Sequence, residues 1–404
     1  MSESGAPAPV PTLAIVALSS AAFGTAASTR VTDPMLPILA STYQVGIGTA
    51  ANVVTLFTLA YGVFQIVYGP VGDRFGKYRV IAWACVACAL TALGCALAPS
   101  FGLLTLARFT AGATAAAVIP LSMAWIGDVL PYEQRQPVLA RFLIGQMLGF
   151  SAGSLMGGLG AEHLGPRIPF AFLACWFAAS AALLFHLLRT ARVPTAAGPA
   201  SSLRDFAADI RYVWRQPWAR VVLVTVFLEG VFMFGAFAFI ATHLHGHHGV
   251  SLTFAGTLVM LYGVGGVFFA VLAPTLVRRL GEVGLAKGGG VLICATLLTI
   301  GLTASWPLTA LALVLMGMGF YMLHNTLQTN ATQMAPQKRG TAVSQFAASL
   351  FLGQSAGVAL AGMVAERFDT TAVVIGGALG VLAIAFTFAR LRLAKQRAPS
   401  VAAP

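Results

Sequence analysis

Apolar runs of about 20 residues, each long enough to cross a lipid bilayer, recur along the whole chain. Short polar stretches separate these runs, and the alternation of apolar and polar residues that is typical of a membrane β-barrel is absent. The pattern therefore predicts an all-α membrane protein. Its twelve transmembrane helices are expected at roughly 11–38, 49–68, 80–98, 101–127, 138–161, 168–189, 219–243, 252–274, 288–304, 307–332, 341–364 and 370–389.

Composition strengthens this prediction. Apolar residues make up 58% of the chain and charged residues 9%, and the mean hydropathy is +0.84. The first span has an acidic, proline-containing flank without a small-residue cleavage site, so we expect it to be retained and not removed as a signal peptide. The five cysteines all lie inside apolar runs. We interpret them as packing residues, including Cys85 and Cys88 at a spacing that metal sites also use.

The basic residues predict how the chain crosses the membrane. Of the 24 lysines and arginines, twenty lie in alternate loops and the C-terminal tail, and four lie in the spans or on the opposite side. Loops rich in lysine and arginine stay in the cytoplasm. Both termini are therefore expected on the cytoplasmic side of a bacterial-type inner membrane. The net charge of +12 is then a signal of orientation, and no nucleic-acid partner is expected.

One long connection, 190–218, divides the chain into predicted halves at 1–189 and 219–404. The connection begins with proline, alanine and serine and becomes amphipathic from Leu203 onward. We expect the later part to form a short helix on the inner leaflet of the membrane. A disordered linker is the alternative.

The two halves repeat. A shift of 204 residues places Arg135 on Arg339, Gly149 on Gly353, and Ala161-Glu162 on Ala365-Glu366. With six spans each, the halves have the same orientation in the membrane, and such repeats enclose a central cavity near the midplane. The repeat therefore favours a transporter over a channel.

Motifs in the first half resemble those of the major facilitator superfamily. The signature of its loop between spans two and three is matched at Gly69, Asp73, Arg74, Gly76 and Lys77. The resemblance implies the family's fold, two pseudo-symmetric halves of six helices, and a conformational latch at this loop. A solvated turn is the alternative reading. We expect Asp128, at the inner end of span four, to pair with Arg74 in the latch.

Three further segments are similar to motifs of the same family. Arg108 followed by Gly112 resembles its arginine-x-x-x-glycine motif, and an arginine snorkelling to the surface is the alternative. The segment Thr32-Asp33-Pro34-Met35-Leu36-Pro37 resembles the twelve-span drug:proton antiporter branch, which implies efflux and multidrug resistance. The antiporter motif is matched at Gly149, Gly153, Gly157 and Gly158, with Ser154 where the motif has proline.

Two acidic residues are candidates for proton coupling. Glu229 lies about ten positions into span seven with no basic residue within helical reach, so its ionised form is costly there. We expect it to be protonated much of the time and to exchange a proton as the cavity alternates. A permanently neutral, hydrogen-bonded carboxyl is the alternative. Asp33 follows Arg30 by three residues, and Arg108 is expected nearby, so Asp33 is either a second proton site or the partner of these cations.

Span ten carries polar residues at helical spacing, which either line the cavity or bond between helices. Aromatic and amide side chains of other spans are expected to add contacts, and their low charge favours an amphiphilic or lipophilic substrate. The residues predicted to contact substrate are Arg30, Asn52, Tyr61, Gln65, Trp125, Tyr262, His324, Asn325 and Gln328. At the four outer-loop histidines, His243, His245, His247 and His248, no metal is expected, because the neighbouring sequence offers no acidic or cysteine ligand; a metal site there is the alternative.

The sequence thus predicts a secondary active transporter that exports a small amphiphilic compound by proton antiport through alternating access. The sequence has no nucleotide-binding loop, so no cofactor is expected and the proton gradient is the expected source of energy. The expected partners are the substrate, protons and the lipid bilayer, and the expected state is a monomer. A proton-coupled uptake symporter is the alternative. An intramembrane enzyme is a remote one, since no His-Glu-x-x-His or nucleophile with its base occurs at membrane depth.

Overall fold

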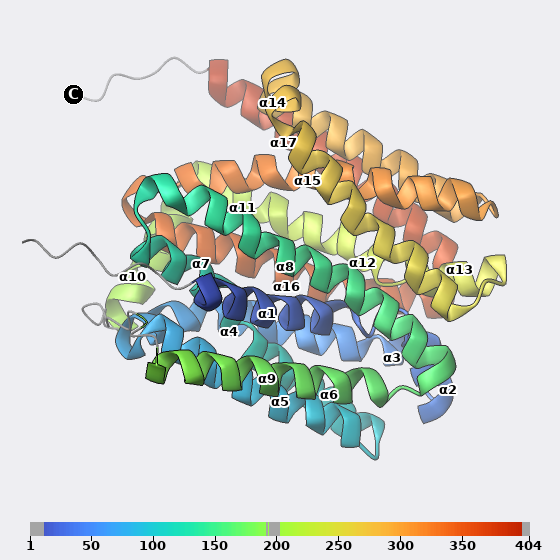
Figure 1. Ribbon diagram of the computed structural model, residues 1–404. Coiled ribbons are helices and arrows are strands. Elements are labelled where there is room, and N and C mark those ends of the chain that lie inside the picture. Colours follow the sequence, from blue (N-terminus) through green and yellow to red (C-terminus); the bar gives the residue numbers. More distant parts are fainter. Residues whose placement is uncertain (1–11, 191–192, 194–202, 398–404) are drawn as a thin grey trace, which may run out of the picture.

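The computed structural model describes residues 12–190, 193 and 203–397, and these form helices without any β-strand (Figure 1). The first half contains α1 (Thr12–Arg30), α2 (Leu36–Tyr43), α3 (Ile47–Ala50), α4 (Asn52–Phe75), α5 (Lys77–Leu97), α6 (Phe101–Ala115), α7 (Val118–Val129), α8 (Tyr132–Leu159), η1 (Gly160–Leu164) and α9 (Ile168–Thr190). The remaining elements are α10 (Leu203–Arg215), α11 (Pro217–Glu229), η2 (Gly230–Phe234), α12 (Gly235–Phe237), α13 (Ile240–His248), α14 (Leu252–Leu302), α15 (Trp306–Gln333), η3 (Pro336–Lys338), α16 (Arg339–Arg367) and α17 (Thr370–Arg397).

The number of membrane spans agrees with the twelve that the apolar pattern predicts. Eleven segments of the described chain are long and apolar enough to cross a bilayer, and one of them, α14, has 51 residues. A straight helix of that length would be roughly 75 Å long, more than twice the roughly 30 Å of a hydrocarbon core. At Gly281 the backbone leaves the helical region with φ of 60°, so α14 consists of two spans. The predicted spans 252–274 and 288–304 lie on either side of this break.

The turn between spans two and three begins later than the sequence indicated. The predicted hinge starts at Gly69, but Gly69 and Pro70 are inside α4, which continues to Phe75. The chain turns only at Gly76, whose φ of 86° favours glycine. A proline is tolerated inside a membrane-spanning helix because neighbouring helices, hydroxyl side chains or a local change of helix geometry can satisfy the backbone carbonyl that loses its N–H donor.

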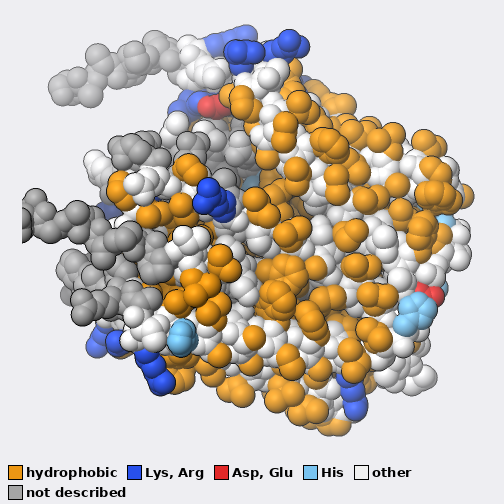
Figure 2. Space-filling model, in the orientation of Figure 1, with side chains coloured by type: hydrophobic (Ala, Val, Ile, Leu, Met, Phe, Trp, Pro, Cys, Tyr) orange, Lys and Arg blue, Asp and Glu red, His pale blue; other side chains and the backbone are white. Residues whose placement is uncertain are grey.

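Connections rich in lysine and arginine lie together at one end of the bundle, which we call the basic end. It includes the turns at Gly76 and Gly281, the helix α10 and the end of α17, on the left and upper left of Figure 1. The other end, which we call the opposite end, carries α2, α3 and α13. Figure 2 shows an extensive apolar surface between them, as expected for helices that face lipid.

Glycines bring α8 and α1 into close contact. A Cβ atom at Gly149 or Gly153 would collide with the backbone carbonyl of Phe23 or Ala27, respectively. In the second half, Gly353 and Gly357 of α16 approach the carbonyls of Phe227 and Val231 in the same way. All four glycine contacts are related by the 204-residue shift, so the repeat in the sequence is also a repeat in the packing.

The halves meet mainly where α8 crosses α14 and where α4 crosses α16. Two hydroxyl groups donate across the first crossing, from Ser151 to the carbonyl of Met260 (3.1 Å) and from Thr253 to that of Gly158 (3.3 Å), and one donates across the second, from Ser355 to the carbonyl of Thr55 (2.9 Å). The expected helix in the long connection is present as α10, although 191–192 and 194–202 lie outside the described residues. An ion pair of 2.8 Å between Asp209 and Lys338 attaches α10 to the second half.

The cysteines are free, and four of the five are buried as expected. Cys175 is the exception. It lies on the exposed face of α9, so its interpretation as a buried packing residue is wrong.

Candidate functional site

Two buried carboxylates, one from each half, define the centre of the protein. Asp33 lies in the turn after α1 and Glu229 is the last residue of α11, with exposures of 1% and 0%. Arg30 donates from Nη1 to Oδ2 of Asp33 over 3.3 Å, and this ion pair is itself buried. Oδ1 of Asp33 has no hydrogen-bond partner among the described residues.

Glu229 is not unpaired, contrary to the sequence-based expectation. Its Oε2 lies 2.8 Å from Nδ1 of His324 on α15, 95 positions along the chain, while Oε1 has no partner in the described structure. The same contact shows that His324, predicted only as a cavity residue, is the partner of the candidate proton site. The π-helical turn η2 begins directly after Glu229, and such turns are frequent at functional sites.

Aromatic rings connect the two acid–base pairs. The guanidinium of Arg30 lies over Phe234 and Phe237, with its carbon 4.5 and 4.8 Å from the ring centroids. Phe234 packs edge-on against Phe320 at 5.2 Å, and Phe320 stacks on His324 at 4.8 Å. A continuous path of side chains therefore runs from Arg30 in the first half to Glu229 in the second.

A small recess adjoins this path. Arg30, Phe237 and Tyr262 line it, together with Phe150, Ser151 and Ser154 of α8. Sites for drug-sized ligands typically have volumes of about 300–1,000 Å³. The recess is smaller than that, so a ligand of that size does not fit into it in this conformation.

Arg108 is fully buried, so the alternative of a snorkelling arginine is wrong. It donates to the carbonyl of Val53 (3.1 Å), the carbonyl of Ser28 (3.0 Å) and the hydroxyl of Ser28 (3.3 Å). Its guanidinium carbon also lies 4.1 Å from the centroid of the Phe57 ring. Arg108 is close enough to Asp33 to interact electrostatically with it, as expected.

The other predicted cavity residues are spread over the structure. Tyr61 is buried at the crossing of α4 and α16, with its ring 4.1 Å from that of Phe351, and Gln65 is buried one turn further along α4. Trp125 packs against Tyr78 near the basic end, at 5.0 Å. Asn52 and Asn325 are half-buried and Gln328 is exposed. Their contact with substrate remains a prediction.

The predicted latch forms around a different cation. Nζ of Lys77 lies 2.7 Å from Asp73 and 2.8 Å from Asp128, whereas Arg74 is exposed and stacks on Phe75. The expected pair of Asp128 with Arg74 is therefore wrong. The cause is the continuation of α4 to Phe75, which places Lys77 directly after the turn and between both carboxylates.

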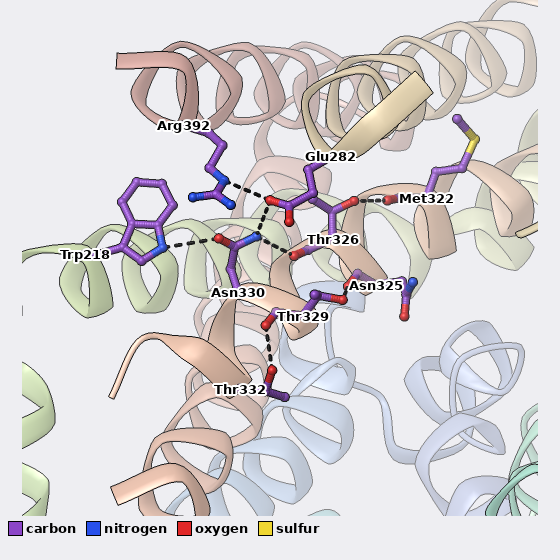
Figure 3. A network of polar contacts seen from close by, with 9 residues as sticks. All are labelled: Trp218, Glu282, Met322, Asn325, Thr326, Thr329, Asn330, Thr332 and Arg392. Carbon is purple, nitrogen blue, oxygen red and sulfur yellow. Dashed lines mark hydrogen bonds and ion pairs between the residues drawn. The ribbon is translucent and has the colours of Figure 1, made fainter. Parts of the chain in front are cut away.

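The second half has a counterpart of the latch with opposite charge (Figure 3). Glu282 follows the turn at Gly281 as Lys77 follows the turn at Gly76. Its Oε2 accepts hydrogen bonds from Arg392 of α17 (2.8 Å) and from Asn330 of α15 (3.2 Å). Asn330 in turn accepts a hydrogen bond from the indole of Trp218 (3.2 Å), so four helices meet in this network.

Sequence reasoning missed Asn330. The polar residues of span ten drew attention to His324, Asn325 and Gln328, but the side chain that joins neighbouring helices is Asn330, which is 2% exposed. The available signal was an uncharged amide inside a membrane span, a position where its polar groups need partners on neighbouring helices.

The outer-loop histidines belong to helix α13 and pack against the start of α17. His243 shares a hydrogen bond of 3.0 Å with Thr370, and His247 one of 2.8 Å with Asp369. Among the described residues, no group of three or more histidine, cysteine or acidic side chains is arranged to hold a metal ion.

Twelve spans in repeated halves around buried, paired carboxylates are features of a membrane transporter. The chain belongs to the Major Facilitator Superfamily, whose model matches residues 18–358. The family is one of transporters and not of enzymes.

Known members of the family align with most of this chain, but at low sequence identity. An uncharacterised transporter of the family, YceJ of Bacillus subtilis (strain 168), is 24% identical over 86% of this chain and 88% of its own. A bicyclomycin resistance protein homolog of Haemophilus influenzae (strain ATCC 51907 / DSM 11121 / KW20 / Rd) is 26% identical over 85% and 88%. Among solved structures, a mutant of the nucleoside transporter NupG superposes with a TM-score of 0.79 at 16% identity, covering 94% of this chain and 99% of that one.

Proposed function

We propose that the protein exports a small amphiphilic organic compound in exchange for protons, by alternating access of a central site to the two sides of the membrane. The basic end is assigned to the cytoplasm because loops rich in lysine and arginine remain there. The proton gradient supplies the energy, and the working unit is a monomer in a bacterial-type inner membrane.

The pair of Glu229 and His324 carries the proposal. A carboxyl and an imidazole 2.8 Å apart can share one proton without leaving a full charge unpaired in the membrane. His324 is partly accessible, with 14% of its side chain exposed, whereas Glu229 is not exposed at all. Opening of the centre would bring water to this pair and allow a proton to leave or enter.

The aromatic path supports an amphiphilic substrate. Phe234, Phe237 and Phe320 present ring faces and edges next to the polar groups of Arg30 and Tyr262. Such a surface suits a compound with one apolar and one polar side. Export is favoured by the similarity to a bicyclomycin resistance protein homolog and by the glycine contacts of α8 with α1.

Transport by the purified protein in liposomes with an internal pH-sensitive dye tests the proposal. A proton gradient is imposed, and lipophilic cations, neutral antibiotics, sugars and organic acids are added in turn. We expect protons to move opposite to at least one amphiphilic compound, and Glu229→Gln to abolish the movement. Asp369→Asn is the matched control, because Asp369 also lies 2.8 Å from a histidine but at the opposite end of the helices.

Three results would change the proposal. Protons and substrate moving together would make the protein a symporter. Unchanged exchange in Glu229→Gln would remove Glu229 from the coupling. Equal losses in Glu229→Gln and Asp369→Asn would indicate a general structural defect in place of a role in coupling.

A further inference from the structure

Two glutamates at the opposite end of the molecule reach from one half to the other. Oε1 of Glu366, at the end of α16, accepts hydrogen bonds from the backbone N–H groups of Gly48 (2.9 Å) and Thr49 (3.2 Å). Oε2 of Glu162, in η1, accepts one from the N–H group of Thr253 (3.0 Å). Each carboxylate thus holds the first turn of a span that belongs to the other half.

These contacts are equivalent in the repeat. A shift of 204 residues places Glu162 on Glu366 and also places Thr49 on Thr253. The two hydrogen bonds therefore connect the same pair of positions, once from the first half to the second and once in the reverse direction. Local helix capping alone does not require that both copies keep the acid and its partner.

The packing beneath each carboxylate is equivalent as well. Gly158 and Gly362 lie four residues before the two glutamates. A Cβ atom at Gly158 would lie 2.6 Å from the carbonyl oxygen of Leu252, and one at Gly362 would lie 2.9 Å from Cα of Gly48. Because only glycine permits this approach, each glutamate can reach the N–H groups of the facing helix.

The negative charge of the two carboxylates strengthens these hydrogen bonds. A carboxylate that accepts backbone N–H groups makes charge-assisted hydrogen bonds, and at the start of the long helix α14 the helix dipole adds to this stabilisation. Among the described residues no ion pair joins the two halves. Both glutamates are also exposed at the end of the bundle, where water can replace the N–H donors when the halves separate.

We propose that Glu162 and Glu366 form a matched pair of latches that keep the opposite end of the transporter closed. Each latch breaks when the halves separate at this end and re-forms when they close. The halves rock as units, so the two latches act together although they contact different helices.

Hydrogen–deuterium exchange of the full-length protein in lipid nanodiscs tests the proposal without any substrate. The segments to follow are 47–55 and 252–258, which begin the two latched spans. In Glu366→Ala, we expect exchange to accelerate by about tenfold in both segments, which corresponds to about 1.4 kcal/mol, close to the lower end of what a hydrogen bond to a charged group contributes. Glu162→Ala is expected to have the same effect on both.

The distant segment distinguishes a latch from a simple helix cap. Loss of a cap would accelerate exchange only where the N–H groups lost their acceptor, that is, 47–55 for Glu366→Ala and 252–258 for Glu162→Ala. That result would overturn the proposal, as would unchanged exchange in the double variant. Glutamine keeps an acceptor oxygen, so Glu366→Gln should restore most of the slow exchange.

A control variant accounts for general loosening of this end. Asp369 lies three residues after Glu366, but its carboxylate contacts His247, Thr370 and Thr371 within its own half. Asp369→Ala should leave both segments unchanged, and equal acceleration there would contradict the latch. These outcomes do not depend on proton exchange, so the latch and the proposed transport function can fail separately.

Discussion

Gly153 offers a sharp test of the packing between α8 and α1. A Cβ atom at this position would lie 2.5 Å from the carbonyl oxygen of Ala27 and 2.8 Å from its Cα. Both atoms belong to the backbone, so Gly153→Ala can be accommodated only if the two helices move apart.

The expected magnitude follows from two opposing effects. Replacing glycine by alanine inside a helix stabilises it by about 1 kcal/mol, whereas overpacking a tight contact costs about 1–3 kcal/mol. Gly127 in α7 experiences only the first effect, because a Cβ there meets no atom within 4 Å. Gly153→Ala should therefore be about 1–3 kcal/mol less stable than Gly127→Ala.

Thermal unfolding in detergent, followed by circular dichroism, measures this difference. Gly357→Ala should behave like Gly153→Ala, since its Cβ would collide with the carbonyl of Val231 in the equivalent crossing. Equal unfolding temperatures for Gly153→Ala and Gly127→Ala would refute the reasoning, because they would show that the helices separate without cost.

Three further predictions concern charged groups. Arg108→Lys should lower the free energy of unfolding by about 2–4 kcal/mol, because a lysine cannot reproduce the fork of hydrogen bonds to Ser28 and Val53; chemical denaturation measures it, and a stability equal to wild type would contradict it. A double-mutant cycle with Glu282→Gln and Arg392→Gln should give a coupling of about 1 kcal/mol, and strict additivity would show that the 2.8 Å contact contributes nothing. Burial, the largest single effect, raises the pKa of the Asp369 carboxyl, but the hydrogen bonds from Thr371, His247 and Thr370 together outweigh it and hold the pKa below its ordinary value of 3.8. The ionised carboxylate therefore stabilises the fold above pH 3.8, and this stabilisation is lost as the pH falls below that value. Between pH 6 and about pH 3, the unfolding temperature of Asp369→Asn should decrease less than that of wild type. Parallel curves of unfolding temperature against pH for the two proteins would contradict this.

Much of the architecture could be predicted because it depends on patterns within short segments of the sequence. Span length follows from apolar runs, and the division of α14 into two spans follows from the polar turn that contains Gly281. The repeat was visible as identical residues at a constant shift, and the same shift relates the glycine contacts of Gly153 and Gly357. These features depend on neighbours in sequence or on copies of them.

The pairing of side chains could not be predicted, because it depends on how the helices rotate against each other. Glu229 and His324 were both identified, but nothing in two separate spans indicates that they face each other. Lys77 replaces Arg74 in the latch because α4 is longer than the glycine and proline at its end suggested. A shift of a few residues in a helix end changes which side chain points to a neighbour.

In the proposed exchange, the pair formed by Glu229 and His324 gives up its proton when substrate binds. Titration calorimetry of the purified protein measures this directly, with the compound that gives the largest signal in liposomes. Binding heats are compared in two buffers of different ionisation enthalpy, which reports the protons released per substrate bound. Wild type should release protons when it binds substrate at a pH where the pair carries a proton. Glu229→Gln should bind substrate without releasing protons. Equal heats in both buffers for wild type, or unchanged release in Glu229→Gln, would contradict a role of this pair in proton exchange.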